Sequence, residues 1–263
     1  MTTTRFITEL ALATEVAARA GELLVDRLGR VESVRHKSPK DVVTEVDNLS
    51  EKLILDAILE AYPDDGMLAE ESGLAAGRSN RVWVVDPLDG TINYANGIPI
   101  FCVAIGLVVD GVPSVGVVHD PIRGETFGAT ADGPATLDGQ PIRASAKASM
   151  ADFVIALTID GANLSERLAA IRDAIRVTRR LGSSALALAY VGAGRFDAFA
   201  QTQGLSAWDV GAAGLVAVRA GATLTDATGG AWFDIDRGTR TFGIVAAPPA
   251  HHRRLLELVR SPG

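Results

Sequence analysis

Four short acidic segments of this 263-residue chain carry the residue types that could do chemistry. Carboxylates are the hard oxygen ligands that Mg²⁺ prefers, and a buried carboxylate is unfavourable unless a cation or a proton neutralises it. A set of clustered carboxylates would therefore indicate a divalent-metal site. The four segments are Asp41-Val42-Val43-Thr44-Glu45-Val46-Asp47, Glu70-Glu71-Ser72, Asp86-Pro87-Leu88-Asp89-Gly90-Thr91 and Trp208-Asp209.

The segment that begins at Asp86 is the most informative of the four. A short apolar run, 82–85, ends at the carboxylate of Asp86, and Asp89 follows three positions later. Gly90 and Thr91 come next, where a helix could begin, so their backbone N–H groups are placed to bind a phosphate. Metal-binding carboxylates beside a phosphate-binding turn indicate metal-assisted phosphate chemistry.

Each segment also has an ordinary structural interpretation. Asp-Gly pairs commonly form turns, Glu70 and its acidic neighbour would suit a solvated loop, and Asp209 could cap the helix that follows it. Thr44 and Asp47 fit a capping box, in which two side chains bond the backbone N–H groups at a helix start. These structural roles do not explain why all four segments occur in one chain.

Hydrophobic periodicity predicts the elements that must position the acidic segments in the first half of the chain. Apolar residues at spacings of three and four predict helices over residues 10–28 and from Thr44 to Pro63. Apolar runs bounded by turn residues predict strands at 67–69, 82–85, 101–109 and 113–118. Asp110-Gly111 joins the last two as a hairpin turn, so we expect this region to form an antiparallel sheet.

The second half alternates strands and helices, which is typical of an α/β layer. The pattern predicts strands at 153–157, 196–200 and 242–246, and helices at 166–175, 183–191 and 210–220. A stretch rich in Ser, Ala and Lys at 144–149 separates the two patterns. We therefore expect an N-terminal unit of helices and antiparallel sheet over residues 1–148 and a C-terminal α/β layer over residues 149–263.

Composition argues against several classes of function. A net charge of −7 and a pI of about 5.1 make the chain a poor non-specific binder of nucleic acid or of anionic membranes. A single cysteine, Cys102, excludes an internal disulfide framework. Neither a signal peptide nor an apolar stretch of about 20 residues is visible, so we expect a cytoplasmic protein with no nucleic-acid or membrane partner.

Together the four segments resemble the motifs of the inositol monophosphatase family, which are Mg²⁺-dependent, lithium-sensitive phosphatases. The stretch from Asp86 to Tyr94 is similar to the first family signature, and Trp208-Asp209-Val210-Gly211-Ala212-Ala213-Gly214 is similar to the second. The other two segments match further family motifs in the same order along the chain. The resemblance implies a homodimer and a layered α/β/α/β/α sandwich, with an N-terminal antiparallel sheet and a smaller C-terminal mixed sheet.

The resemblance also implies roles for individual residues. Thr91, bonded to Asp47, would orient the attacking water, and Glu70 would act with them in catalysis. Two to three Mg²⁺ ions per site are implied, and their ligands would be Glu70, Asp86, the backbone carbonyl of Leu88, Asp89, Asp209 and, through water, Asp47. The implied substrate contacts are Asp89, Gly90, Thr91, Gly182, Ser183, Ser184, Gln201, Thr202 and Asp209.

The activity implied is hydrolysis of a small phosphorylated sugar or polyol, with inositol-1-phosphate favoured. Fructose-1,6-bisphosphatase, histidinol-phosphatase and 3′-phosphoadenosine 5′-phosphate phosphatase activities stay open, as does a non-enzymatic role as a regulatory scaffold. Many family members carry a Glu just after the strand predicted at 196–200, where it contacts ring hydroxyls. Here Gln201 or Thr202 takes that place, depending on the direction of counting, and a neutral hydrogen bond is weaker than a charged one.

Overall fold

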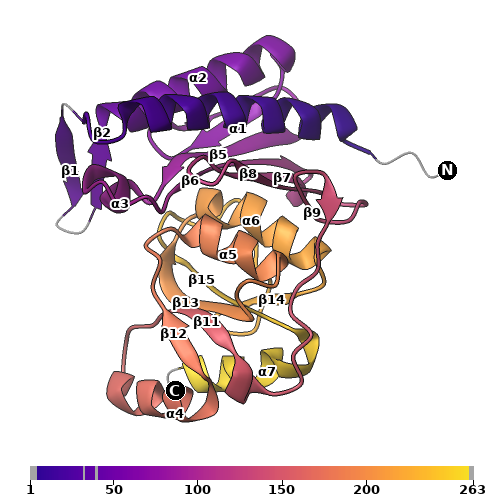
Figure 1. The fold of residues 1–263 in the computed structure, drawn as a ribbon. Helices are drawn as coiled ribbons and strands as arrows, with labels where there is room; N and C mark the ends of the chain where they lie inside the picture. Colours follow the sequence, from indigo (N-terminus) through magenta and orange to yellow (C-terminus); the bar gives the residue numbers. More distant parts are fainter. Residues whose placement is uncertain (1–4, 32, 39–40, 261–263) are drawn as a thin grey trace.

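The computed structural model describes residues 5–31, 33–38 and 41–260, and in these residues helices and sheets alternate in layers. A pair of helices, a large sheet, a second pair of helices, a smaller sheet and a third pair of helices follow one another (Figure 1). The predicted layered α/β/α/β/α sandwich is therefore confirmed. No helix within the described ranges is both long enough and apolar enough to cross a membrane.

Helices α1 (Ile7–Arg27) and α2 (Glu45–Ala61) form the first layer, as the apolar spacing predicts. The small residues Ala13, Ala17 and Ala20 of α1 are fully buried, so this helix can lie close to the sheet beneath it. A hairpin of β1 (Val34–Ser38) and β2 (Asp41–Thr44) connects the two helices.

The large sheet contains eight strands in the order β10-β9-β8-β7-β6-β5-β3-β4. Two inner strands of this sheet, β6 and β7, form the predicted hairpin. The turn between them has positive φ at both Asp110 and Gly111, as such a hairpin requires. The short helix α3 (Thr91–Ala95) follows β5. The strands are β3 (Gly66–Ala69), β4 (Gly73–Ala75), β5 (Arg81–Asp89), β6 (Cys102–Val109), β7 (Val112–Asp120), β8 (Glu125–Thr130), β9 (Thr136–Leu137) and β10 (Gln140–Pro141).

One strand pair corrects the prediction of a wholly antiparallel first sheet. Strands β3 and β5 run parallel, with Leu68 opposite Val84, whereas the other pairs described in this sheet are antiparallel. The reason is that β4 turns back along the outer edge of β3. The chain then crosses to the other side of β3 and enters β5 in the direction of β3.

The middle layer consists of α5 (Ser184–Gly192) and α6 (Ala207–Arg219), which lie between the two sheets (Figure 1). Helix α5 is apolar on nearly every side, as expected for a helix covered on both faces. Helix α6 lies close against β7 at Gly116. A Cβ at this position would be only 2.4 Å from the carbonyl oxygen of Ala212, so the close approach requires glycine. One hydrophobic core joins these helices to both sheets.

The smaller sheet has the strand order β12-β11-β13-β15-β14 and is mixed, as predicted. Helices α4 (Leu164–Ala174) and α7 (Pro249–Val259) cover its outer face (Figure 1). A short 3₁₀ turn, Met150–Asp152, precedes the first strand. The strands are β11 (Val154–Thr158), β12 (Val177–Arg179), β13 (Ala198–Leu205), β14 (Thr223–Asp226) and β15 (Phe242–Ala247).

The predicted boundary at residue 148 lies in the connection between β10 and the 3₁₀ turn. The buried carboxylate of Asp197 anchors this connection, because it accepts hydrogen bonds from Ser145, Lys147 and the backbone N–H of Val154. The helices of the second half pack against the sheet of the first half. The division into residues 1–148 and 149–263 remains a prediction.

Candidate functional site

The two carboxylates of the third acidic segment lie at an irregularity near the end of β5. The pairing of β5 with β6 shifts between Asp86 and Asp89, so three steps on β5 oppose two on β6. Pro87 lies inside this bulge, where its lack of an N–H group costs no ladder bond. Ser50 of α2 donates a hydrogen bond of 2.9 Å to the carbonyl of Pro87, which ties the bulge to the first helical layer.

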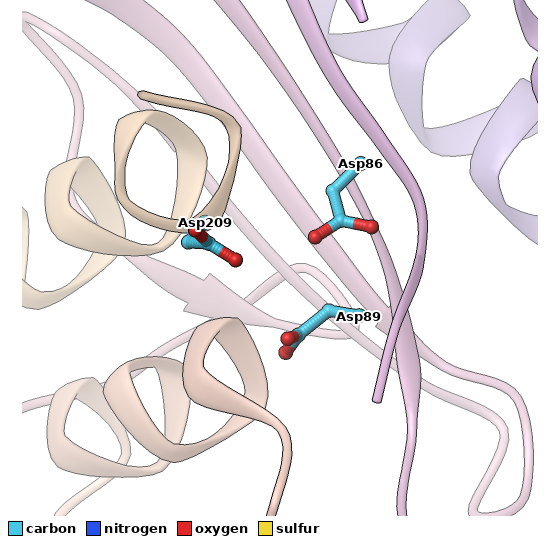
Figure 2. Close-up of side chains that lie close together, drawn as sticks. All are labelled: Asp86, Asp89 and Asp209. Atoms are coloured by element: carbon cyan, nitrogen blue, oxygen red, sulfur yellow. The ribbon is translucent and has the colours of Figure 1, made fainter. Parts of the chain in front are cut away.

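Asp86, Asp89 and Asp209 come together in one acidic cluster, although Asp209 belongs to the first turn of α6 (Figure 2). One oxygen of each carboxylate lies within 4.8 Å of the others. Asp86 and Asp89 are almost fully buried, with exposed fractions of 1% and 7%. Asp86 and Asp209, which the family resemblance assigns to the metal site, are thus neighbours in the fold.

Burial and mutual repulsion act together on this acidic cluster. Burial raises the pKa of Asp86 well above its usual range, and the negative charges of Glu70, Asp89 and Asp209 raise it further. The pKa of Asp209 is also raised well above its usual range, first by burial and then by Asp89 and Glu70. A divalent cation would offset both effects, and the donors are all hard oxygens, so the residues present fit such an ion.

Glu70 follows β3 directly and lines the same pocket as the cluster. Its backbone N–H donates to the carbonyl of Val85 on the neighbouring strand. The next two backbone N–H groups, of Glu71 and Ser72, donate to the buried carboxylate of Glu51 at 2.8 and 2.9 Å. The sequence analysis does not name Glu51 as a site residue. Its position could have indicated this role, because residues four apart on a helix share one face, and Glu51 follows Asp47 by four on α2.

Asp47 uses one carboxylate oxygen to cap α2 and the other to bond Thr91 in the pocket wall. Its Oδ2 accepts hydrogen bonds from the backbone N–H and the hydroxyl of Thr44 in a capping box at the start of α2. Its Oδ1 accepts the hydroxyl of Thr91 at 2.9 Å. Burial raises the pKa of Asp47, and the bonds from Thr44 and Thr91 oppose the rise. The side chain of Asp41 lies outside the described part of the structure.

Asp89 links the first half of the chain to the loop before α5. Its carboxylate accepts hydrogen bonds from the hydroxyl of Ser183 and from the backbone N–H groups of Ser184 and Ala185. These N–H groups begin α5, where a negative charge is favourable. Asn93, which the sequence analysis does not single out, donates to the carbonyl of Leu181 and so holds the same loop from α3.

Asp209 is not the N-cap that its sequence position permits. Ser206 is the N-cap of α6, and Asp209 is the third helical residue, whose carboxylate accepts the backbone N–H of Ser206 at 2.6 Å. This position within the first turn of α6 brings the side chain beside the carboxylates of β5 (Figure 2).

Gln201 and Thr202, the two candidates for the position of the family's Glu, have different surroundings in the structure. Gln201 lines the pocket, and its carbonyl oxygen accepts the hydroxyl of Ser184 at 3.2 Å. Thr202 instead accepts the backbone N–H of Asp160 and is not among the residues that line the pocket. The pairing of β13 with β15 is irregular between Gln201 and Leu205.

The pocket has a volume of about 240 Å³, which suits a small metabolite. Asp47 reaches it through Thr91. Arg179, Arg180 and Arg240 also line it, although the sequence analysis does not predict them. The predicted site residues that line the pocket are Glu70, Asp86, Leu88, Asp89, Gly90, Thr91, Gly182, Ser183, Ser184, Gln201 and Asp209.

Comparison with known proteins places this site in a family. The sequence matches the inositol monophosphatase family over residues 8–262. The chain belongs to the inositol monophosphatase family. This is a phosphatase family whose members depend on metal ions, and the acidic cluster of this inositol monophosphatase homologue could hold such an ion.

Relatives cover most of the chain. The Nus factor SuhB of Pseudomonas aeruginosa is 38% identical over 235 residues, which are 84% of this chain and 86% of that protein. A fructose-1,6-bisphosphatase/inositol-1-monophosphatase of Thermotoga maritima is 37% identical over 222 residues, 84% of this chain and 85% of its own. The solved structure of the suppressor protein SuhB of Bartonella henselae superposes with a TM-score of 0.89 at 32% identity, covering 97% of this chain and 100% of that one.

Proposed function

We propose that this inositol monophosphatase homologue is a Mg²⁺-dependent phosphomonoesterase for small sugar or polyol phosphates, inositol-1-phosphate among them. The observation that carries the proposal is the acidic cluster of Asp86, Asp89 and Asp209, which shares one pocket with the hydroxyl of Thr91. Membership of a phosphatase family supports the same reaction. The pocket volume of about 240 Å³ supports a small substrate.

The donor set suits two Mg²⁺ ions that share a carboxylate. Asp86, Asp89 and Asp209 would hold one ion. Glu70, the backbone carbonyl of Leu88 and Asp86 would hold the other. Each residue offers the hard oxygen that Mg²⁺ prefers. When bound, the ions would supply Lewis acidity, which neutralises phosphate charge and makes coordinated water more acidic.

Thr91 and Asp47 would orient the attacking water. The hydroxyl of Thr91 can donate its single proton to Asp47, and its lone pairs are then left to accept a proton of water. Asp47 is buried and held by Thr44, so the pair of Thr91 and Asp47 presents a fixed acceptor to the nucleophile.

Two further contacts complete the proposed site. Asp47 would act with Glu70 to place a third, weaker ion through water. The backbone N–H groups of Gly90 and Thr91 would bind the phosphate.

The loop of Gly182, Ser183 and Ser184 and the side chain of Gln201 would contact the alcohol part of the substrate. Their presence in the pocket lining supports this role. Gln201 is neutral, and its carbonyl oxygen already accepts the hydroxyl of Ser184, so it offers ring hydroxyls a weaker bond than a Glu would. We therefore expect hydrolysis of several phosphorylated polyols, with no overwhelming preference for inositol-1-phosphate.

A substrate panel tests the proposal. Inositol-1-phosphate, fructose-1,6-bisphosphate, histidinol phosphate and 3′-phosphoadenosine 5′-phosphate would be compared by kcat/KM, with and without Mg²⁺. We expect Mg²⁺-dependent turnover, with more than one substrate within a factor of ~10³, about 4 kcal/mol of transition-state discrimination. Li⁺ at millimolar concentration and Ca²⁺ should inhibit, the latter because Ca²⁺ takes more ligands at longer distances than Mg²⁺ does. Turnover of none of these substrates would refute the proposal.

A regulatory scaffold is the second candidate function. It is supported by the 38% identity to a protein named as a Nus factor, which suggests protein partners. Asp86→Asn separates the two roles in an organism that depends on the protein, because a scaffold would retain its function when turnover is lost. The expected homodimer is tested independently by sedimentation.

A further inference from the structure

We propose that Glu51 of α2 is a positioning residue of the metal site, whose buried carboxylate clamps the turn after β3 and so fixes the place of Glu70. This role rests on the proposed function, in which Glu70 holds a metal ion, and deepens it by assigning a residue that would touch neither ion nor substrate. Two hydrogen bonds carry the role, and they connect α2 to the turn across 20 and 21 positions of the chain.

Glu51 uses both oxygens of its carboxylate on this turn. Oε2 accepts the backbone N–H of Glu71 at 2.8 Å, and Oε1 accepts the backbone N–H of Ser72 at 2.9 Å. Glu51 is only 5% exposed, so little water competes for these bonds. Successive backbone N–H groups form a concave site for an anion, and a hydrogen bond to a carboxylate is stronger than one to a neutral acceptor. The carboxylate of Glu51 therefore holds the turn firmly.

The backbone of Glu70 is held on both sides of its Cα. The N–H of Glu70 donates to the carbonyl of Val85 on β5 at 3.2 Å, which holds the peptide group before the Cα. The N–H of Glu71 donates to Glu51, which holds the peptide group after it. Because peptide groups are planar, two fixed planes set the direction of the Cα–Cβ bond between them. The side chain of Glu70 therefore starts from a fixed point in the pocket wall.

Other side chains cannot replace Glu51 in this arrangement. Two N–H donors require two acceptors, and the amide of a Gln has only one acceptor oxygen. The NH₂ group of the Gln would face a second donor, so one of the two bonds would be lost. An Asp keeps both acceptor oxygens but is one methylene shorter, so it would stretch or lose at least one bond. Both changes should loosen the turn and the backbone of Glu70 with it.

Two more buried residues on the same face of α2 hold the neighbouring segments of the site. Asp47, Ser50 and Glu51 have the i, i+3, i+4 spacing that places side chains on one face of a helix. Asp47 accepts the hydroxyl of Thr91 at 2.9 Å, and Ser50 donates to the carbonyl of Pro87 at 2.9 Å. One helix thus anchors the start of α3, the bulge of β5 and the turn after β3. Glu51 provides the last of these anchors.

Metal binding in the absence of substrate tests this role. The Kd for Mn²⁺, which takes the same oxygen ligands as Mg²⁺, would be measured by electron paramagnetic resonance for wild type, Glu51→Gln and Glu51→Asp. We expect both variants to raise the Kd by about 10- to 100-fold, the usual cost of losing a group that orients a metal ligand. The Mg²⁺ concentration for half-maximal turnover should rise as well, while kcat at saturating Mg²⁺ should be largely retained.

Glu9→Gln is the matched control for the loss of a buried carboxylate. Glu9 lies on α1, is 8% exposed, accepts a hydrogen bond of 3.0 Å from Arg81 and does not line the pocket. Both Gln variants should lower the free energy of unfolding, measured by chemical denaturation in EDTA. Only Glu51→Gln should change the Kd for Mn²⁺.

Two results would overturn the positioning role. One is an unchanged Kd for Mn²⁺ in folded Glu51→Gln, which would leave Glu51 a purely structural role. The other is a wild-type Kd in Glu51→Asp, which would show that the charge matters and the paired bonds do not. Glu51→Asp also decides the question if Glu51→Gln does not fold. Wild type that binds Mn²⁺ but hydrolyses no phosphomonoester would refute the phosphatase function alone, whereas wild type that binds no Mn²⁺ would refute both proposals.

Discussion

Asp86 is the residue on which the proposed chemistry depends most, because it would contact both metal ions. We expect Asp86→Asn to lower Mg²⁺-dependent turnover by more than the roughly 100-fold that loss of an outer metal-site partner costs. The fold should persist, which circular dichroism would check. Near-normal turnover of the variant at saturating Mg²⁺ would contradict this role.

Asp86→Asn should lower turnover, but it should not lower the stability of the protein without metal. Because burial and neighbouring carboxylates raise the pKa of Asp86, the folded protein holds a proton that the unfolded chain releases above about pH 3.8. The free energy of unfolding of the metal-free wild type therefore decreases as the pH rises from about 3.8 towards the raised pKa of Asp86 in the folded protein. Asp86→Asn removes that loss, so in EDTA at pH 7 the Tm of the variant should equal or exceed that of wild type. A lower Tm would show that the carboxylate is stabilising without metal.

Gln201 is the residue expected to set selectivity. Gln201→Glu should raise kcat/KM for inositol-1-phosphate relative to fructose-1,6-bisphosphate by about tenfold, since a charged acceptor strengthens bonds to hydroxyls. Thr202→Glu is the matched control, because Thr202 bonds the backbone of Asp160 and does not line the pocket. An unchanged ranking in the first variant, or an equal change in both, would contradict the assignment.

Residue types and spacing were sufficient to single out the carboxylates that the structure brings together, but not the contacts that hold them in place. Asp86 and Asp89 were predictable because they come directly after an apolar run, 82–85, that predicts a buried strand. The bond from Ser183 to Asp89 crosses 94 positions, so no local pattern contains it. Arg240 is also remote in sequence, since its backbone N–H bonds the hydroxyl of Ser206 across 34 positions, and the backbone N–H of Ser206 in turn donates to Asp209. Such contacts depend on how the layers pack.

At the scale of elements, the loop between β12 and α5 forms part of the pocket wall. Gly182 has a φ of 78°, and a Cβ there would lie 2.9 Å from the side chain of Asn93. We expect Gly182→Ala to displace Asn93 and with it the loop, which should lower kcat/KM about tenfold. The left-handed conformation adds about 1 to 2 kcal/mol of destabilisation.

Gly111 offers a control for this prediction. Its φ of 79° is nearly the same, but a Cβ would meet nothing within 4 Å. Gly111→Ala should therefore cost a similar free energy of unfolding, measured by chemical denaturation, and leave kcat/KM unchanged. Equal losses of activity in both variants would show that strain alone, not the contact with Asn93, affects the site.

Periodicity predicted the long elements well because their burial alternates with the helical or strand repeat. Helix α1 and the hairpin of β6 and β7 follow the predicted ranges closely. The two-residue strands β9 and β10 were not predictable, since so few residues hold no periodicity. The parallel pairing of β3 and β5 was also missed, because pairing direction depends on the path of β4 around the sheet edge.

At the scale of the whole molecule, two buried histidines make stability depend on pH. Burial lowers the pKa of His119, although the negative charges of Asp120, Asp138 and Glu22 oppose this shift. Burial also lowers the pKa of His252. Below pH 6.5 the unfolded chain binds protons that the folded protein does not, so stability is lost as pH falls through that value. The slope of Tm against pH between about 5 and 7 should be smaller in His119→Gln than in wild type. An identical slope would exclude this histidine as the cause.

The placement of α5 and α6 has a consequence for biosynthesis. The large sheet is complete in sequence at Pro141, but one of its faces is covered by helices that span residues 184–219. While the ribosome is still producing those residues, the apolar side chains of that face are exposed and can bind chaperones or other nascent chains. A fragment that stops at residue 148 should therefore aggregate when expressed alone and become soluble when the remainder is supplied in the same cell.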